Sequence, residues 1–144
     1  MKQHPTCTQP TETLRENPRC LYVPEVGPSL NEFYAGMHYA ERTKLADDWK
    51  WIVQAEVSQQ RFTEPNELDF PLRVVVRAHF PDRRYWYDSG NIGATEKLIV
   101  DGLRASDVLP DDDPRHVFGT TLETWLHDGG AEDDRFTLLL FRSV

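Results

Sequence analysis

Acidic side chains and one lysine gather in the stretch between residues 88 and 112. An acid with a nearby amide comes first, then a lysine with an acid four residues later, then a pair of acids: Asp88, Asn91, Lys97, Asp101, Asp111 and Asp112. Clustered carboxylates repel one another, and they stay ionised when a divalent cation sits between them. Mg²⁺ keeps several waters, so two or three carboxylates suffice when a phosphate supplies further oxygens. The stretch therefore favours Mg²⁺ bound against a phosphate, with Asp88, Asp111 and Asp112 as candidate ligands.

The other residues of the stretch suit supporting roles in phosphoryl chemistry. A bound metal polarises a scissile phosphate and lowers the pKa of an attacking water. Lys97 would offset negative charge in the transition state. Asp101 follows four residues later, on the same helical face, and would hold the Lys97 ammonium in place. Asn91 has an amide that can donate to a carboxylate or a backbone carbonyl and so fix the loop.

These acids can meet only if the chain after the intervening helix folds back along it. The pattern predicts a helix over Ala94 to Ala105, with Leu98, Ile99 and Leu103 facing the core. A helix of about eleven residues spans roughly 16 Å, so its two ends are not adjacent. The connector from Arg104 to Pro110 is long enough to return along the helix. We therefore expect the acids on either side of the helix to converge.

The remaining elements predict an α+β fold, in which a small mixed or antiparallel sheet carries two main helices. A stripe of Leu45, Trp49, Ile52 and Val53 predicts a helix from about 41 to 60, whose Trp49 face should pack on the sheet. Strands are expected at Cys20–Val23, Leu72–Phe80, His116–Trp125 and Arg135–Arg142. The turn signal Asp128-Gly129-Gly130 predicts an antiparallel hairpin from the last two strands.

Composition bounds the class of protein. The 144 residues suit a single domain, here 20–144, preceded by a polar leader at 1–19. The net charge of −8 excludes a simple basic coat for nucleic acid, but a metal-dependent nuclease needs only a local basic strip, for which Arg83 and Arg84 are the candidates. No signal-peptide pattern or membrane-length apolar run occurs, so we expect a cytoplasmic protein. Cys7 and Cys20 lack metal-ligand spacing, and we expect thiols in preference to a disulfide.

The run from Asp88 to Val117 resembles the RusA family of Holliday-junction resolvases, which are common in phages and prophages. That family carries Asp-x-Asp-Asn, a lysine, Asp-(Ala/Gly)-Leu and an apolar connector ending in Asp-Asp. The corresponding segments here are Asp88-Ser-Gly-Asn91, Lys97, Asp101-Gly-Leu103 and Val108-Leu-Pro-Asp-Asp112. The resemblance implies a small α+β homodimer that binds four-way DNA junctions and cuts them with Mg²⁺ or Mn²⁺. It further implies that Lys97, Asp88 and Asp112 are catalytic, and that such a protein acts in the bacterial cytoplasm.

One departure from that family pattern leaves alternatives open. Gly90 stands where the second acid of the first motif is expected, and Asp111, Asp113 and Glu96 are the possible substitutes. An active junction endonuclease is the first interpretation. A branched-DNA-binding protein of the same fold, weakened or inactive as an enzyme, is the second. A third is a domain whose acid clusters bind Ca²⁺ or a basic protein, independently of DNA.

Overall fold

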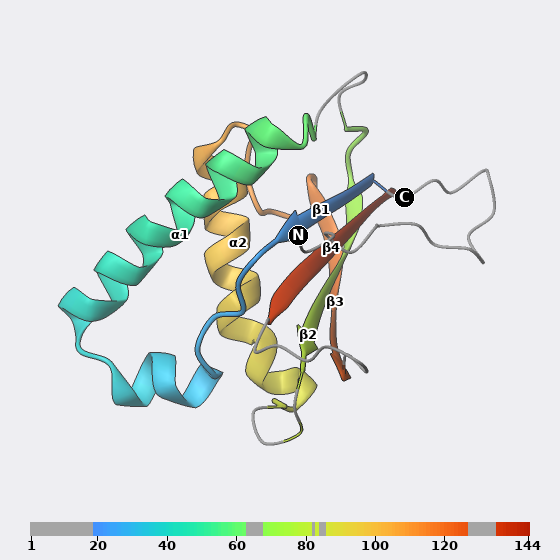
Figure 1. Ribbon diagram of the computed structural model, residues 1–144. Coiled ribbons are helices and arrows are strands. Elements are labelled where there is room, and N and C mark those ends of the chain that lie inside the picture. The colour runs from blue at the N-terminus through green and yellow to red at the C-terminus, as the bar shows by residue number, and fades with distance from the viewer. Residues whose placement is uncertain (1–18, 63–67, 82, 84–85, 127–134) are drawn as a thin grey trace.

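A four-stranded sheet with two main helices on one of its faces makes up the fold (Figure 1). The computed structural model describes residues 19–62, 68–81, 83, 86–126 and 135–144. Along the chain, the elements are β1 (Arg19–Val23), a π-helical turn (Glu32–Gly36), α1 (Tyr39–Gln59), β2 (Leu72–Phe80), the 3₁₀ helix η3 (Ser89–Ile92), α2 (Gly93–Ala105), β3 (Val117–Leu126) and β4 (Phe136–Ser143). The α+β class is therefore as expected from the sequence.

The strand order in the sheet is β1-β4-β2-β3. β2 pairs in parallel with β3, and β4 pairs antiparallel with both β1 and β2. The expected hairpin between the last two strands is therefore wrong, because β2 lies between them. The turn signal at residues 128–130, on which that expectation rested, lies outside the described residues.

Burial explains why β2 and β4 take the central positions. Six residues of β2 are buried, as are the first six of β4, whereas no residue of β3 is fully buried. A strand that alternates apolar and polar residues has one face open to solvent and can lie at an edge of the sheet. A nearly continuous apolar strand is typical of a position where both faces are buried. Parallel strands also need a long crossover, and α2 provides it between β2 and β3.

The core lies between the sheet and the two helices, which pack against each other on one face of the sheet (Figure 1). α1 buries Trp49 and Val53, and its main contact is with α2, followed by a smaller one with β1. The expectation that the Trp49 face of this helix packs on the sheet is confirmed, because Trp49 and Val53 belong to one buried core with β1, β2 and β4, and α1 also packs against α2. Gly102 of α2 lies directly against Val53, where an added Cβ would meet the valine Cβ at 2.7 Å.

Smaller differences concern the start of the domain. Arg19, expected to end the leader, is the first residue of β1; it pairs with Phe141, and its Nη1 donates to the Phe62 carbonyl at 3.0 Å. Residues 1–18 lie outside the described residues. Cys20 is disulfide-bonded, so the expectation of a thiol is wrong there. No helix in the described ranges is long and apolar enough to cross a membrane.

Candidate acidic site along helix α2

Helix α2 holds the central part of the candidate site. It buries Leu98, Ile99 and Leu103, each at most 1% exposed, against the core. Its outer side carries Lys97 and Asp101, one turn apart, whose Nζ and Oδ2 atoms are 3.6 Å apart. The predicted lysine–acid pair therefore forms. Half of the Lys97 side chain is exposed, so this ion pair leaves the ammonium accessible to a ligand.

The chain after α2 turns back along the helix, as the connector length predicted. Asp107, with φ of 60°, ends the helix in a left-handed conformation, and the N–H groups of Val108 and Leu109 both donate to the Leu103 carbonyl, at 3.0 and 3.3 Å. The side chains of Val108 and Leu109 are buried in the core. Burial of Val108 and Leu109 holds the connector after α2 against the helix. Asp111, Asp112 and Asp113, which follow in the chain, therefore lie beside α2.

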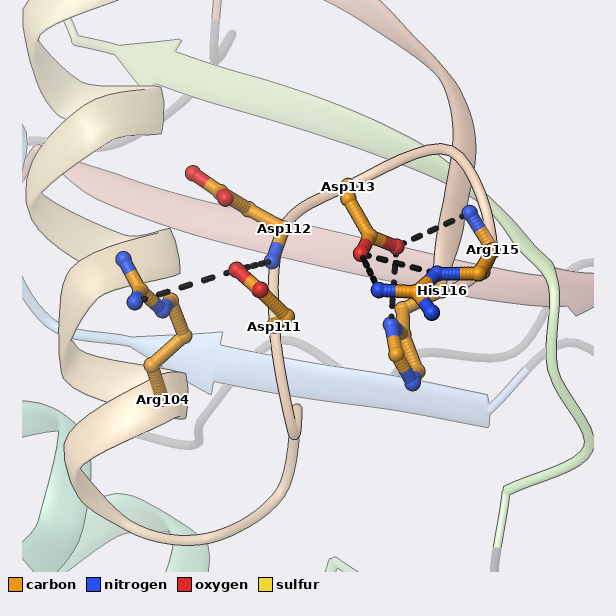
Figure 2. A network of polar contacts seen from close by, with 6 residues as sticks. All are labelled: Arg104, Asp111, Asp112, Asp113, Arg115 and His116. Atoms are coloured by element: carbon orange, nitrogen blue, oxygen red, sulfur yellow. Dashed lines mark hydrogen bonds and ion pairs between the residues drawn. The ribbon is translucent and has the colours of Figure 1, made fainter.

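The side chains of the three consecutive acids, Asp111, Asp112 and Asp113, point in different directions (Figure 2). Asp111 forms an ion pair with Arg104, whose Nη2 is 3.8 Å from Asp111 Oδ1. The same Oδ1 accepts a hydrogen bond from the Asp112 N–H at 2.8 Å. Asp112 directs its carboxylate toward α2, whereas Asp113 points the opposite way, into the turn that leads to β3. Of the three side chains, that of Asp112 projects toward the helix and forms no hydrogen bond or ion pair within the described residues.

Asp113 serves the local turn. Its carboxylate accepts hydrogen bonds from the side chain of Arg115, including one from Nε at 3.0 Å, and contacts His116 Nδ1 at 3.0 Å. The Arg115 hydrogen bond, helped by His116, lowers the pKa of Asp113 to about 2. In this structure the Asp113 carboxylate is therefore engaged by the residues of its own turn.

Glu96, in the first turn of α2, is the acid of this region whose pKa is raised. Burial raises the pKa of Glu96, the neighbouring Lys97 lowers it, and the Asp101 and Asp112 carboxylates raise it further. Glu96 lies about two turns before Arg104 on the helix. Asp112 is thus near enough to α2 to influence Glu96 electrostatically, whereas Asp111 pairs with Arg104 in the last turn. Glu96, Lys97, Asp101 and Asp112 therefore share one electrostatic environment, in which Lys97 and Asp101 form the direct ion pair.

Asp88 stands apart from this group among the described contacts. It is exposed at the start of η3, where its carbonyl accepts the Asn91 N–H at 2.9 Å. The Asn91 amide shows no hydrogen bond to a site acid within the described residues. An added Cβ at Gly90 would meet nothing within 4 Å. The missing acid would therefore have room.

The predicted trio of metal ligands does not assemble in the structure. Within the ranges that the structure describes, no three His, Cys, Asp or Glu side chains are grouped closely enough to hold a metal ion. Asp88, Asp111 and Asp112 all belong to those ranges. Arg83, a candidate DNA contact, is exposed, and Arg84 lies outside the described residues.

Sequence reasoning gave Glu96 only as one of three possible substitutes, and it missed Arg104 as the partner of Asp111. Arg104 falls on the outer side of α2, seven residues after Lys97, and this two-turn spacing was the available signal. No protein-family model matches this chain, and no curated protein sequence matches it either. The resemblance to junction resolvases therefore rests on the motif residues alone.

Proposed function

We propose that this protein is a metal-dependent endonuclease that cuts four-way DNA junctions. The observation that supports it best is the return of the chain along α2. This return sets Asp112 against a helix that already carries Glu96, Lys97 and Asp101. Carboxylates beside an accessible ammonium suit a phosphodiester, because the acids attract a cation and the lysine attracts the phosphate.

Each residue of the group has a separate role in this proposal. Lys97, oriented by Asp101, neutralises charge that develops on the phosphate. The Asp101 and Asp112 carboxylates both raise the pKa of Glu96, and this repulsion disfavours ionising all of them in the absence of a cation. Asp88 would have to approach from the η3 loop, where it is exposed and unconstrained by a side-chain cap.

The fit to a divalent metal is partial. A three-carboxylate cage does not exist among the described residues. Mg²⁺ in phosphoryl-transfer sites is often held by only one or two carboxylates together with substrate oxygens and water. Glu96 and Asp112 would be those two ligands. Such a cation would supply Lewis-acid polarisation of the phosphate.

A second function is favoured by Gly90 and by the lack of a three-acid group. On this alternative, the protein binds branched DNA and does not cut it. Gly90→Asp distinguishes the two, since the new carboxylate would extend into open space without disturbing the fold. If the native protein binds junctions without cutting and Gly90→Asp cuts, the binding role is correct. If the native protein cuts and Gly90→Asp adds nothing, the alternative fails.

The main test uses a synthetic four-way junction with Mg²⁺ or Mn²⁺. We expect Asp112→Asn to lower the cleavage rate by about 100-fold or more while junction affinity is kept, because one ligand is neutralised and distant basic contacts remain. Asp48→Asn, an exposed acid on α1, is the matched control and should cut normally. Folded native protein that neither cuts nor binds the junction at any metal concentration would exclude both functions.

Variants of the proposed DNA contacts should lose junction binding and keep cleavage, the reverse of the result expected for Asp112→Asn. Arg83→Ala combined with Arg84→Ala should weaken junction binding, and its salt dependence, while cleavage at saturating protein remains. Equal loss of binding and cutting in this variant and in Asp112→Asn would count against the separate roles. The proposal also includes a homodimer acting on DNA in the bacterial cytoplasm. Light scattering on the native protein gives the oligomeric state.

A further inference from the structure

The face of the sheet opposite the helices carries a groove lined by arginines. Residues of β2 alternate, so Leu72, Val74 and Val76 enter the core, and Arg73 and Arg77 face away from both helices. A groove of about 370 Å³ lies on this second face. Its polar lining comes from three strands: Arg73, Arg77, Arg142, Thr120, Thr121 and Glu123.

Aromatic rings hold two of these arginines in place. The Arg73 guanidinium lies over the Phe118 ring, 4.8 Å from its centroid, and the Arg77 guanidinium lies over Trp125 at 4.3 Å. A guanidinium stacked on an aromatic face keeps its N–H groups in the plane and free to donate at its edge. Both side chains are therefore orientated before any ligand arrives.

The two arginines differ in charge balance. Arg77 donates from Nε to Glu123 Oε1 at 2.8 Å, and its side chain is only 14% exposed. Arg73 is exposed and has no ion pair within the described residues. Glu123, the acid in the lining, is paired with Arg77. Positive charge without a carboxylate partner is therefore found at the Arg73 end of the groove.

The sheet register leaves room for a ligand beside Arg73. Arg73 lies opposite Gly119 on β3. Gly119 has no side chain, and a Cβ there would meet nothing within 4 Å. The open space thus adjoins the guanidinium that lacks a carboxylate.

We propose that this groove is a phosphate-binding site, with Arg73 as the principal ligand and the Arg77–Glu123 pair as a fixed wall. A guanidinium fork matches the oxygens of a phosphate group, which it binds through two parallel hydrogen bonds. The phosphate belongs either to a small free ester or to a nucleic-acid backbone. The site lies on the opposite face of the sheet from α2, so it exists whether or not the acidic site cuts DNA.

Backbone NMR signals of the native protein test the site directly. Inorganic phosphate, then adenosine monophosphate, are titrated at low ionic strength, and the amide signals of Gly119 and Thr121 should shift with saturation. Arg73→Ala should weaken binding about tenfold or more, as expected for loss of a charge-assisted bidentate contact. Lys44→Ala removes an exposed positive charge on α1 and should leave the titration unchanged.

A second variant keeps the test independent of Arg73. Gly119→Val fills the open space with a residue that strands favour, so the fold is kept and the ligand is excluded. A short oligonucleotide titrated in parallel identifies the source of the phosphate. Binding of the oligonucleotide that Arg73→Ala weakens indicates a backbone, and binding of the small esters alone indicates a free ligand. Signals that stay unmoved, or shift equally in native protein and Arg73→Ala, overturn the site. Because no cleavage is measured, this result is separate from that of the endonuclease test.

Discussion

Replacing Gly102 by alanine tests the contact that sets the position of α2. A Cβ on Gly102 would lie 2.7 Å from the Val53 Cβ, 2.8 Å from its Cγ2 and 3.1 Å from its Cγ1. Valine in a helix has one strongly preferred rotamer, and no rotation moves its Cβ. The substitution must therefore push α1 and α2 apart in the core, where Val53 is fully buried.

Two opposing effects determine the magnitude. Overpacking a close-packed core costs about 1–3 kcal/mol. Alanine in a helix interior is favoured over glycine by about 1 kcal/mol. The expected net effect is a loss of up to about 2 kcal/mol in the free energy of unfolding, which corresponds to a fall of up to about 8 °C in Tm for a chain of this size.

A matched control exists in the same helix. Gly93, the first residue of α2, has helical dihedrals, and a Cβ there would meet only Leu30, at 3.4 Å or more. Gly93→Ala should therefore raise stability by about 0.4–1 kcal/mol. Urea denaturation of both variants, followed by circular dichroism, measures the difference. A Gly102→Ala protein as stable as Gly93→Ala would refute the close approach of the two helices.

Two further predictions concern buried groups on the same helix. Burial holds the pKa of Glu96 above its usual range, so its charged form is penalised in the folded state, and stability falls as pH rises through the interval above that usual value. Glu96→Gln should accordingly be more stable than the native protein at pH 8 and equal to it at pH 4; thermal melts showing the reverse order would contradict the burial argument. Thr95→Val leaves the buried Gly27 N–H without its 2.9 Å acceptor and should cost about 1–3 kcal/mol in urea denaturation, whereas a neutral effect would mean that water replaces the hydroxyl.

Local patterns in the sequence predicted the elements well. β2 agrees with its expected bounds at Leu72–Phe80, and α2 begins one residue earlier than expected, at Gly93. Both segments have strong periodicity, and α2 ends where its apolar stripe does. Strand pairing could not be obtained in the same way, because it depends on which strands bury both faces, and that emerges only when the helices have covered one side.

Those parts of the candidate site that depend on local spacing were also predictable from the sequence. The Lys97–Asp101 pair follows from helical spacing, and the return of the connector follows from its length. The directions of Asp111, Asp112 and Asp113 do not, since consecutive residues in a turn diverge according to the partners that reach them. Arg104 and Arg115 draw two of the three acids away, and no linear pattern fixes those pairings.

The position of β4 has a consequence for how the molecule can be made. β1 is bonded only to β4 within the described sheet, and the Thr137 hydroxyl donates to the Glu25 carbonyl across 112 positions of sequence. During synthesis, β1 emerges from the ribosome long before the strand that will hold it. Contacts of such high sequence separation slow folding, and a strand exposes apolar surface until its partner strand has been synthesised. Completion of the sheet is therefore delayed until nearly the whole described chain has been released, and a nascent polypeptide that ends at β3 has its first strand without a neighbour.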